Sequence, residues 1–222
     1  MLLACNRSTP RMTDYLVHGI DISHYQSTID WEKVAQQDIS FAFIKATEGA
    51  FYTDSLFCNN WNDAQAASIL RGAYHFFRPT IDAHLQAHNF MTSVQFEFGD
   101  LPPVLDVEVT DGVNKDQLIE GIKTWVQQIE YHSKMTPIIY TNQNFFNDYL
   151  ADDFSKHPIW IARYSRFFNP WLDNNREWRF WQYGNKGRIE GIRGEVDLNV
   201  FKGDIYQLEE MCFGRRMAFQ PR

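Results

Sequence analysis

The segment Pro103-Val104-Leu105-Asp106-Val107-Glu108 decides how the rest of this chain is interpreted. Its apolar residues predict a buried strand, and two acids separated by one valine stand at its end. Because successive side chains of a strand point to opposite faces, Asp106 and Glu108 share one face, with α-carbons roughly 6.5 Å apart. The segment therefore predicts a strand that delivers two neighbouring carboxylates to one side of a sheet.

Short apolar segments alternate with helical patterns on both sides of this strand. Strands are predicted at residues 17–22, 41–46, 70–77, 103–107, 137–140, 159–162, 179–182 and 196–200. Helices are predicted from residue 31, over 59–68 and 83–98, after residue 114, and over 144–150. Such alternation is typical of βα units in a parallel sheet, and about eight strands favour closure into a TIM-like barrel.

The last third of the chain departs from this alternation. The stretch 163–178 holds Pro170 and an Asn-rich loop, and four glycines lie between Tyr183 and Val196. Neither stretch has a helical pattern, so we predict an irregular β/α barrel with missing or shortened late helices, in which the strand pairing could also be irregular. It would form a single domain over 15–213, between a flexible leader (1–14) and a basic flexible tail (214–222).

Composition restricts the class of protein. The 222 residues fit one domain, 44% are apolar, and no stretch is apolar for long enough to span a bilayer. A formal net charge of −7 argues against a nucleic-acid partner. Three widely spaced cysteines predict neither a zinc site nor a disulfide framework. The many aromatic residues indicate either a large aromatic core or, for some rings, the walls of a sugar-binding cleft.

The first residues allow two interpretations. The tetrapeptide Leu2-Leu3-Ala4-Cys5 resembles the end of a bacterial lipoprotein signal, in which Cys5 would carry the lipid. The charged and apolar regions that precede such an end are missing, so a chance likeness is the alternative.

Acidic side chains gather where predicted strands end, which is where active sites lie in parallel barrels. Four carboxylates are expected to converge there: Asp21, Asp106, Glu108 and Asp197. Two acids as close as Asp106 and Glu108 cannot both ionise freely, so the pKa of one rises. Glycosidic cleavage needs such a pair, with one group to protonate the leaving oxygen and another to stabilise positive charge.

Most of these residues also have a purely structural interpretation. Asp21 could cap a turn, and Asp197 could be a turn aspartate. Lys45 and Glu48 could form a surface ion pair, although the apolar run before Lys45 predicts an enclosed stem. Adjacent residues of a strand face opposite ways, so only one of Tyr74 and His75 can face inward, and a buried, hydrogen-bonded histidine is the commoner outcome for His75.

Eight segments together resemble the family 25 glycoside hydrolases, the Chalaropsis-type lysozymes or N-acetylmuramidases. The resemblance runs from about His18 to Phe201. The segments are Gly19-Ile20-Asp21-Ile22-Ser23-His24-Tyr25-Gln26, Phe43-Ile44-Lys45-Ala46-Thr47-Glu48-Gly49, Arg71-Gly72-Ala73-Tyr74-His75-Phe76, Pro103-Val104-Leu105-Asp106-Val107-Glu108, Pro137-Ile138-Ile139-Tyr140-Thr141, Trp160-Ile161-Ala162, Phe180-Trp181-Gln182-Tyr183 and Glu195-Val196-Asp197-Leu198-Asn199. Each is weak alone, but eight in the same order are specific.

The resemblance implies a hydrolase that cuts the β-1,4 bond from N-acetylmuramic acid to N-acetylglucosamine, with retained configuration and without metal or cofactor. It implies that Glu108 is the general acid/base and that Asp106 assists the 2-acetamido group of the substrate; a nucleophilic role for Asp106 stays open. Asp21 and Asp197 would complete the acidic cleft. The implied substrate contacts are Lys45, Glu48, Tyr74, Tyr140, Trp160, Arg163, Trp181 and Gln182.

The implied partner is the glycan strand of peptidoglycan, met by a monomer outside the cytoplasm as a periplasmic, lipid-anchored or secreted protein. Two rival functions fit the same acids. A metal-dependent phosphodiesterase could hold Mg²⁺ with the four carboxylates. A glycan-binding barrel could have lost catalysis, although binding alone does not need four acids in one cleft.

Overall fold

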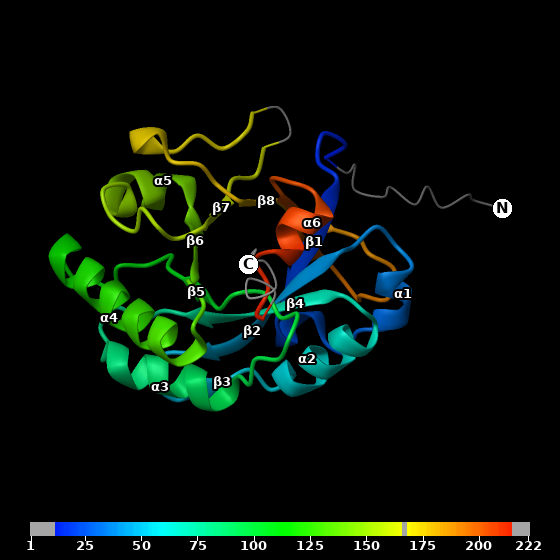
Figure 1. Ribbon diagram of the computed structural model, residues 1–222, viewed down its shortest axis with the longest axis horizontal. Coiled ribbons are helices and arrows are strands. Elements are labelled where there is room, and N and C mark those ends of the chain that lie inside the picture. Colours follow the sequence, from blue (N-terminus) through cyan, green and yellow to red (C-terminus); the bar gives the residue numbers. More distant parts are fainter. Residues whose placement is uncertain (1–11, 166–167, 215–222) are drawn as a thin grey trace, which may run out of the picture.

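The structure is a computed structural model that describes residues 12–165 and 168–214, and its centre is a closed eight-stranded barrel (Figure 1). The order around the barrel is β1-β9-β8-β7-β6-β5-β4-β2, and pairing of β1 with β2 closes it. A short strand, β3 (Tyr52–Thr53), extends β2 as a hairpin. The barrel strands are β1 (Val17–Ile22), β2 (Phe41–Glu48), β4 (Leu70–Phe76), β5 (Val104–Asp106), β6 (Ile138–Asn142), β7 (Ile159–Ala162), β8 (Phe180–Gly187) and β9 (Val196–Phe201). The TIM-like barrel expected from the sequence is therefore confirmed.

The last strand breaks the parallel pattern, because β9 runs antiparallel to both of its neighbours, β8 and β1. Only residues 188–195 join β8 to β9. A parallel crossover needs a dozen or more residues, whereas a hairpin needs few, so the short connection forces β9 to turn back. The parallel pairing that the βα alternation indicated therefore ends at β8, and the irregularity expected in the last third of the chain includes the strand pairing.

Helices cover one side of the barrel and are nearly absent from the other (Figure 1). The main helices are α2 (Phe57–Ala66), α3 (Ala83–Ser93) and α4 (Lys115–Ser133), with shorter α1 (Trp31–Ala35), α5 (Gln143–Phe145) and α6 (Ile205–Glu209). A π-helical turn, η2 (Phe146–Leu150), continues α5, and short 3₁₀ turns are η1 (His24–Gln26) and η3 (Asp173–Asn175). Among the described residues between β7 and β8, η3 is the only helical element, so the expected loss of late helices is confirmed.

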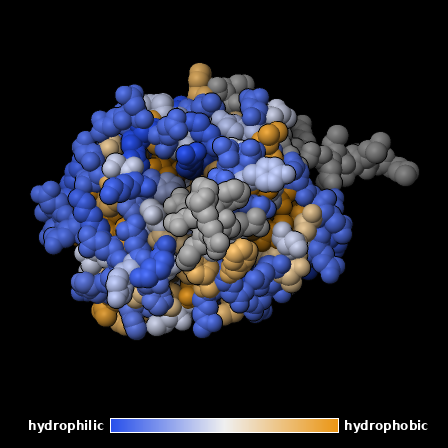
Figure 2. All heavy atoms as spheres, in the orientation of Figure 1, coloured by the Kyte–Doolittle hydropathy of each residue, from blue (hydrophilic) through white to orange (hydrophobic). Residues whose placement is uncertain are grey.

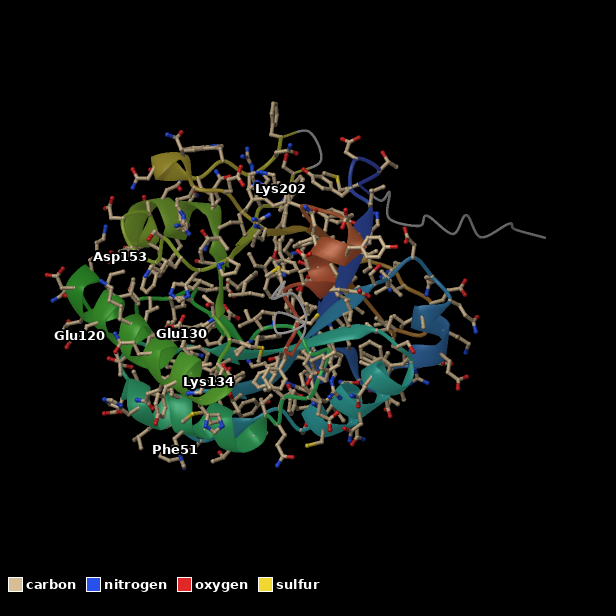
Figure 3. All side chains as sticks on the ribbon, viewed as in Figure 1. Phe51, Glu120, Glu130, Lys134, Asp153 and Lys202 are labelled. Atoms are coloured by element: carbon tan, nitrogen blue, oxygen red, sulfur yellow. The ribbon has the colours of Figure 1, made fainter. Side chains whose placement is uncertain are left out.

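The longest helix, α4, shows how the sequence sets these elements. Asn114 and Gln117 form a reciprocal capping box at its start. Its apolar residues recur at helical spacing and are buried against the barrel, Trp125 completely. Polar residues such as Glu120 project from the opposite side (Figure 3). No helix within the described ranges is long and apolar enough to cross a membrane.

Alternation along β5 divides its side chains between two cores. Val104 belongs to the apolar cluster inside the barrel, whereas Leu105 and Val107 belong to the cluster between the strands and the helices. Asp106 and Glu108 therefore turn inward, as the spacing predicts. Glu108 lies two residues beyond the strand, but Val107 still donates a backbone hydrogen bond to Tyr140, so the extended path continues.

Aromatic rings fill the interior below these acids. Phe43 stacks on Trp160 with ring centroids 4.4 Å apart and meets Phe180 edge-on at 5.1 Å. Tyr140 contacts Trp160 at 4.3 Å. The far end is covered by α6 and the residues after it, because Leu208 and Cys212 join the same interior cluster. Figure 1 is viewed from that covered end, with α6 in front of the strands.

The chain ends were expected to be a leader and a tail. Met12 already packs against the outer core, so the packed part begins no later than this residue. Residues 1–11, which include Cys5, and residues 215–222 lie outside the described part, as do 166–167.

We predict that Gly72→Ala lowers the free energy of unfolding by about 1–3 kcal/mol, because a methyl group at this position has no room. A Cβ at Gly72 would lie 2.7 Å from the ring of Phe43, which fills the barrel interior. Gly184→Ala is the matched control, since a Cβ there meets no atom within 4 Å. Urea unfolding of both variants measures the effect; equal stabilities would contradict the packing described for the interior.

Candidate active site

A pocket of about 240 Å³ opens at the end of the barrel where the parallel strands finish. It contains all four predicted acids. Its walls are Asp21, Ile22, Ser23, Tyr25, Gln26, Lys45, Tyr74, Phe76, Asp106, Glu108, Tyr140, Trp160, Gln182 and Asp197. Strands far apart in the sequence thus bring carboxylates, amides and aromatic rings to one place, as expected for the strand ends of a barrel.

The four acids form two hydrogen-bonded pairs. Asp106 bonds with Glu108, and Asp21 bonds with Asp197. In each pair one member is deep, with Asp106 5% and Asp21 8% exposed, and the other is only partly buried. Asp21 and Asp197 lie directly opposite each other in the β1–β9 ladder. Because β9 runs backwards, the residue near its start lies at the same barrel end as the strand ends.

Burial raises the pKa of both carboxyls in the Asp106–Glu108 pair. Asp106 has a pKa well above its ordinary value, first through desolvation and then through the charge of Glu108. Desolvation also raises the pKa of Glu108, while its hydrogen bond with Asp106 opposes this rise. The positive charge of Lys45 lowers both pKa values and so opposes part of each rise. The pair therefore retains a proton at a pH where ordinary carboxyls have lost theirs, and the deeper acid holds it more tightly.

The Asp21–Asp197 pair follows the same physics. Desolvation and the charge of Asp197 hold the pKa of Asp21 well above its ordinary value, against hydrogen bonds from Asn199 and Gln182 that lower it. Burial also raises the pKa of Asp197. This pair too keeps a proton, so the pocket holds less negative charge than four carboxylates would suggest.

A network of amides and aromatic donors holds Asp21. Its Oδ2 accepts hydrogen bonds from Asn199 Nδ2 at 2.7 Å and from Gln182 Nε2 at 2.9 Å. Asn199 Oδ1 in turn accepts from Trp160 Nε1 at 2.8 Å. Gln182 Oε1 accepts from the hydroxyls of Tyr140 and Tyr164, both at 3.0 Å. Each amide is thereby oriented by a second group behind it.

Lys45 supplies positive charge beside the acids. Its Nζ lies 2.7 Å from Glu48 Oε2, and its side chain is only 12% exposed, so the stem is enclosed as predicted. Glu48 Oε1 also accepts from Arg78 Nη2 at 2.6 Å. Burial would raise the pKa of Glu48, but the hydrogen bonds from Lys45 and Arg78 outweigh it and leave the pKa below its ordinary value. Glu48 therefore fixes Lys45 from behind the pocket wall.

The predicted substrate contacts divide into two groups. Lys45, Tyr74, Tyr140, Trp160 and Gln182 line the pocket, whereas Glu48, Arg163 and Trp181 do not. Trp181 is completely buried in the outer core, because its neighbours Phe180 and Gln182 take the inward face of β8.

The guanidinium of Arg163 is held by other residues. Its Nη1 donates to Gln143 Oε1 and to the backbone oxygen of Asn169, both at 2.9 Å. Arg163 and Trp181, predicted as substrate contacts, thus lie outside the pocket wall, where they hydrogen-bond to the surrounding protein. His75 turns to the helices, where its Nδ1 lies 2.7 Å from Thr47 Oγ1 and its ring stacks on Trp125.

The sequence interpretation assigned no role to several pocket residues. Ser23, Tyr25, Gln26 and Phe76 line the pocket. Ser23 and Gln26 form a capping box around η1, and Tyr25, 82% exposed, is carried on that turn. The Ser-x-x-Gln spacing was a readable signal for this turn. Tyr164 follows Ala162 after one residue and carries no comparable signal.

A larger hollow, about 650 Å³, lies at the covered end of the barrel. It is formed at the starts of β7 and β8 by residues such as Pro158 and Arg179. That end is the face shown in Figure 2, where the surface is mostly hydrophilic. The hollow holds no paired acids, so we place the chemistry in the smaller pocket. In the described part of the chain, no three His, Cys, Asp or Glu side chains are grouped to hold a metal ion.

Known proteins match this chain in sequence over most of its length. Escherichia coli (strain K12) protein YegX is 39% identical over 206 residues, which are 90% of this chain and 75% of YegX. Lysozyme M1 of Streptomyces globisporus is 34% identical over 209 residues, covering 86% of this chain and 70% of that enzyme.

Solved structures agree with the sequence relatives. A family 25 glycosyl hydrolase from Bacillus anthracis superposes with a TM-score of 0.86 at 32% identity, covering 94% of this chain and 99% of that one. A bacterial lysozyme from Streptomyces coelicolor gives 0.83 at 32% identity, covering 90% and 98%. The model of the family described as Glycosyl hydrolases family 25 matches residues 20–192. By sequence and by fold, this chain belongs to glycosyl hydrolase family 25.

Proposed function

We propose that this protein is a lysozyme-type muramidase that hydrolyses the β-1,4 bond between N-acetylmuramic acid and N-acetylglucosamine in peptidoglycan, with retention of configuration. Membership of family 25 and similarity to Lysozyme M1 support the substrate class. The observation that carries the mechanism is the direct hydrogen bond between the buried Asp106 and the less buried Glu108.

That hydrogen bond bears on which atom attacks the sugar. Retaining enzymes with a protein nucleophile separate their two carboxyls by about 5–5.5 Å, and inverting enzymes separate them by about 6.5–9.5 Å. Two carboxyls in direct contact are closer than either arrangement. The pair therefore favours attack by a group of the substrate itself, the 2-acetamido oxygen, over attack by Asp106.

Asp106 is suited to assist that group. Its Oδ1 is buried and accepts no hydrogen bond from an N–H group or a hydroxyl of the described residues. A buried acceptor without a partner is costly, and the N–H of a bound acetamido group would satisfy it. As this N–H docks, the proton of the pair passes to Glu108, and the Asp106 carboxylate accepts the acetamido proton while the carbonyl oxygen attacks the anomeric carbon.

Glu108 then completes both steps. It gives its proton to the glycosidic oxygen as that bond breaks, which leaves a bicyclic oxazoline-like intermediate on the muramic acid. The ionised Glu108 next removes a proton from water, which opens the ring from the face that the leaving group vacated, and Asp106 returns the acetamido proton to the nitrogen. Two inversions give retention. Asp21 and Asp197 keep one wall of the cleft acidic, and Lys45 offsets the negative charge of the Asp106–Glu108 pair.

The substrate indicates where the enzyme works. Peptidoglycan lies outside the cytoplasmic membrane, so we infer an extracytoplasmic place of action. Two experiments distinguish the rival functions from a muramidase. A metal-dependent phosphodiesterase would lose activity in the presence of a chelator. A glycan-binding barrel would release no new sugar ends from peptidoglycan.

We expect Glu108→Gln to abolish release of reducing ends from purified peptidoglycan and to leave glycan binding largely intact, because the amide cannot donate an acidic proton. Chromatography of the products identifies the sugar at each new end, and pull-down with insoluble peptidoglycan measures binding. Wild-type enzyme in EDTA is the parallel control and should keep its rate. Turnover within tenfold of wild type would remove Glu108 from its role.

We expect Asp106→Asn to lower kcat on the order of 10²–10⁴-fold, since the substrate then loses a charged partner for its acetamido N–H. Steady-state rates on solubilised glycan strands provide the measurement. If kcat were unchanged, Asp106 would have no part in the reaction.

We expect Asp21→Asn to raise the melting temperature at pH 8 while lowering activity, because asparagine reproduces the protonated acid. A folded-state pKa above the unfolded value means that the native state binds more protons, so stability falls as pH rises through that interval. Each kcal/mol recovered raises the melting temperature by about 2–4 °C in a chain of this size.

The gain should disappear below pH 4, where the acid is protonated in both folded and unfolded protein. Asp63→Asn, at an exposed site on α2, is the control for the loss of one charge. A gain that is the same at pH 4 and pH 8 would contradict the assignment of a proton to this pair.

A further inference from the structure

The loop after β7 carries a tyrosine that reaches the buried network of the pocket. Tyr164 is 57% exposed, yet its hydroxyl lies 3.0 Å from Gln182 Oε1, which is buried. Three contacts fix the backbone around it: Arg163 N donates to Gln182 O at 3.0 Å, Trp181 Nε1 donates to Arg163 O at 2.8 Å, and the Arg163 guanidinium holds Gln143 and Asn169. Tyr164 is thus placed by Arg163 and Trp181, which do not line the pocket.

The orientation of Gln182 depends on what its carbonyl accepts. An amide can face Asp21 with either end, and only its N–H end donates. Two phenol hydroxyls, from Tyr140 and Tyr164, converge on Oε1, and this directs Nε2 to Asp21 Oδ2. Tyr140 comes from a strand inside the barrel and Tyr164 from the loop, so the carbonyl is held from two sides.

The second donor to Asp21 has no such freedom. Indole N–H groups only donate, so Trp160 fixes the carbonyl end of Asn199 and leaves its Nδ2 for Asp21 Oδ2. With two N–H donors on Oδ2, the proton that Asp21 shares with Asp197 must lie on Oδ1. Of the two amides that set this arrangement, Gln182 is the one whose orientation depends on hydroxyls.

We propose that Tyr164 is a positioning residue for the hydrolysis proposed above: through Gln182 it directs an N–H donor to Asp21 Oδ2 and so fixes which oxygen of Asp21 carries the shared proton. The expected effect on activity rests on the proposed function. The hydrogen bonds from Tyr164 through Gln182 to Asp21 do not, because they are present in the protein whatever its substrate. It also gives Arg163 and Trp181 a task, which is to hold the loop that carries Tyr164.

Tyr164→Phe tests the hydroxyl and keeps the ring. Loss of one donor weakens the polarisation of Gln182, so the carboxylate of Asp21 is less stabilised and its pKa rises further. We expect kcat to fall about 3–10-fold, the scale of one hydrogen bond, with KM changed less than about twofold. The acidic limb of the kcat profile should move to higher pH. Tyr206→Phe, at an exposed tyrosine on α6, is the matched control and should change nothing.

Direct titration separates this proposal from the proposed function. The ¹³C carboxyl signal of Asp21 should titrate at higher pH in Tyr164→Phe than in wild type, whether or not the protein cuts peptidoglycan. The other ionisable groups that act electrostatically together with Asp21 are Asp197, Asp106, Tyr74, Tyr140 and Tyr164. All of these groups except Tyr164 are the same in wild type and in Tyr164→Phe. An unmoved Asp21 titration would overturn the proposal, even if muramidase activity were established.

A double-mutant cycle checks the route. If Tyr164 acts through Gln182, then Tyr164→Phe should cost little extra in a Gln182→Met background. Independent, additive losses, or a loss confined to KM, would make Tyr164 a sugar contact and reject the positioning role. Should Gln182→Met fail to fold by circular dichroism, the titration of the single variant decides.

Discussion

The antiparallel pairing of β9 with β1 is the constraint on which the rest of the site depends. It closes the barrel, and it reverses the direction of the last strand, so that Asp197 faces Asp21 directly across the ladder. In a fully parallel barrel, a residue at the start of the last strand would lie at the opposite end, away from the other acids. One short hairpin therefore both seals the fold and brings together one of the two acidic pairs.

Burial of the four acids costs free energy, because it removes their carboxyl groups from water. Hydrogen bonds from neutral groups offset part of this cost. Neutral amides and aromatic N–H and O–H donors, rather than cations, surround Asp21, and Lys45 is the one lysine or arginine among the residues that line the pocket. Such a setting keeps protons on carboxyls that would lose them in water. The aromatic packing below, with Phe43, Trp160 and Phe180, excludes water from that floor and maintains the low polarity.

The sequence predicted most of this arrangement where alternation along a strand could be applied. It placed Asp106 and Glu108 on one face, and it separated Tyr74 from His75. The same rule applied to β8 would have excluded Trp181 as a neighbour of the inward Gln182. Tyr164 could not be found in this way, because a loop residue has no period and its contact with Gln182 spans a fold that only the structure defines. The direction of β9 was open to prediction from loop length alone.

The uneven cover of helices has a consequence for how this scaffold can change. Where β7, β8 and β9 follow one another, no long helix packs outside, and the connection that carries Tyr164 borders the cleft. Segments without a helix tolerate insertion and deletion far better than segments that must fill a layer. The connection that carries Tyr164 can thus vary in length without disturbing a packed helical layer. Changes of length in this connection would leave the hydrogen-bonded ladders of the barrel as they are.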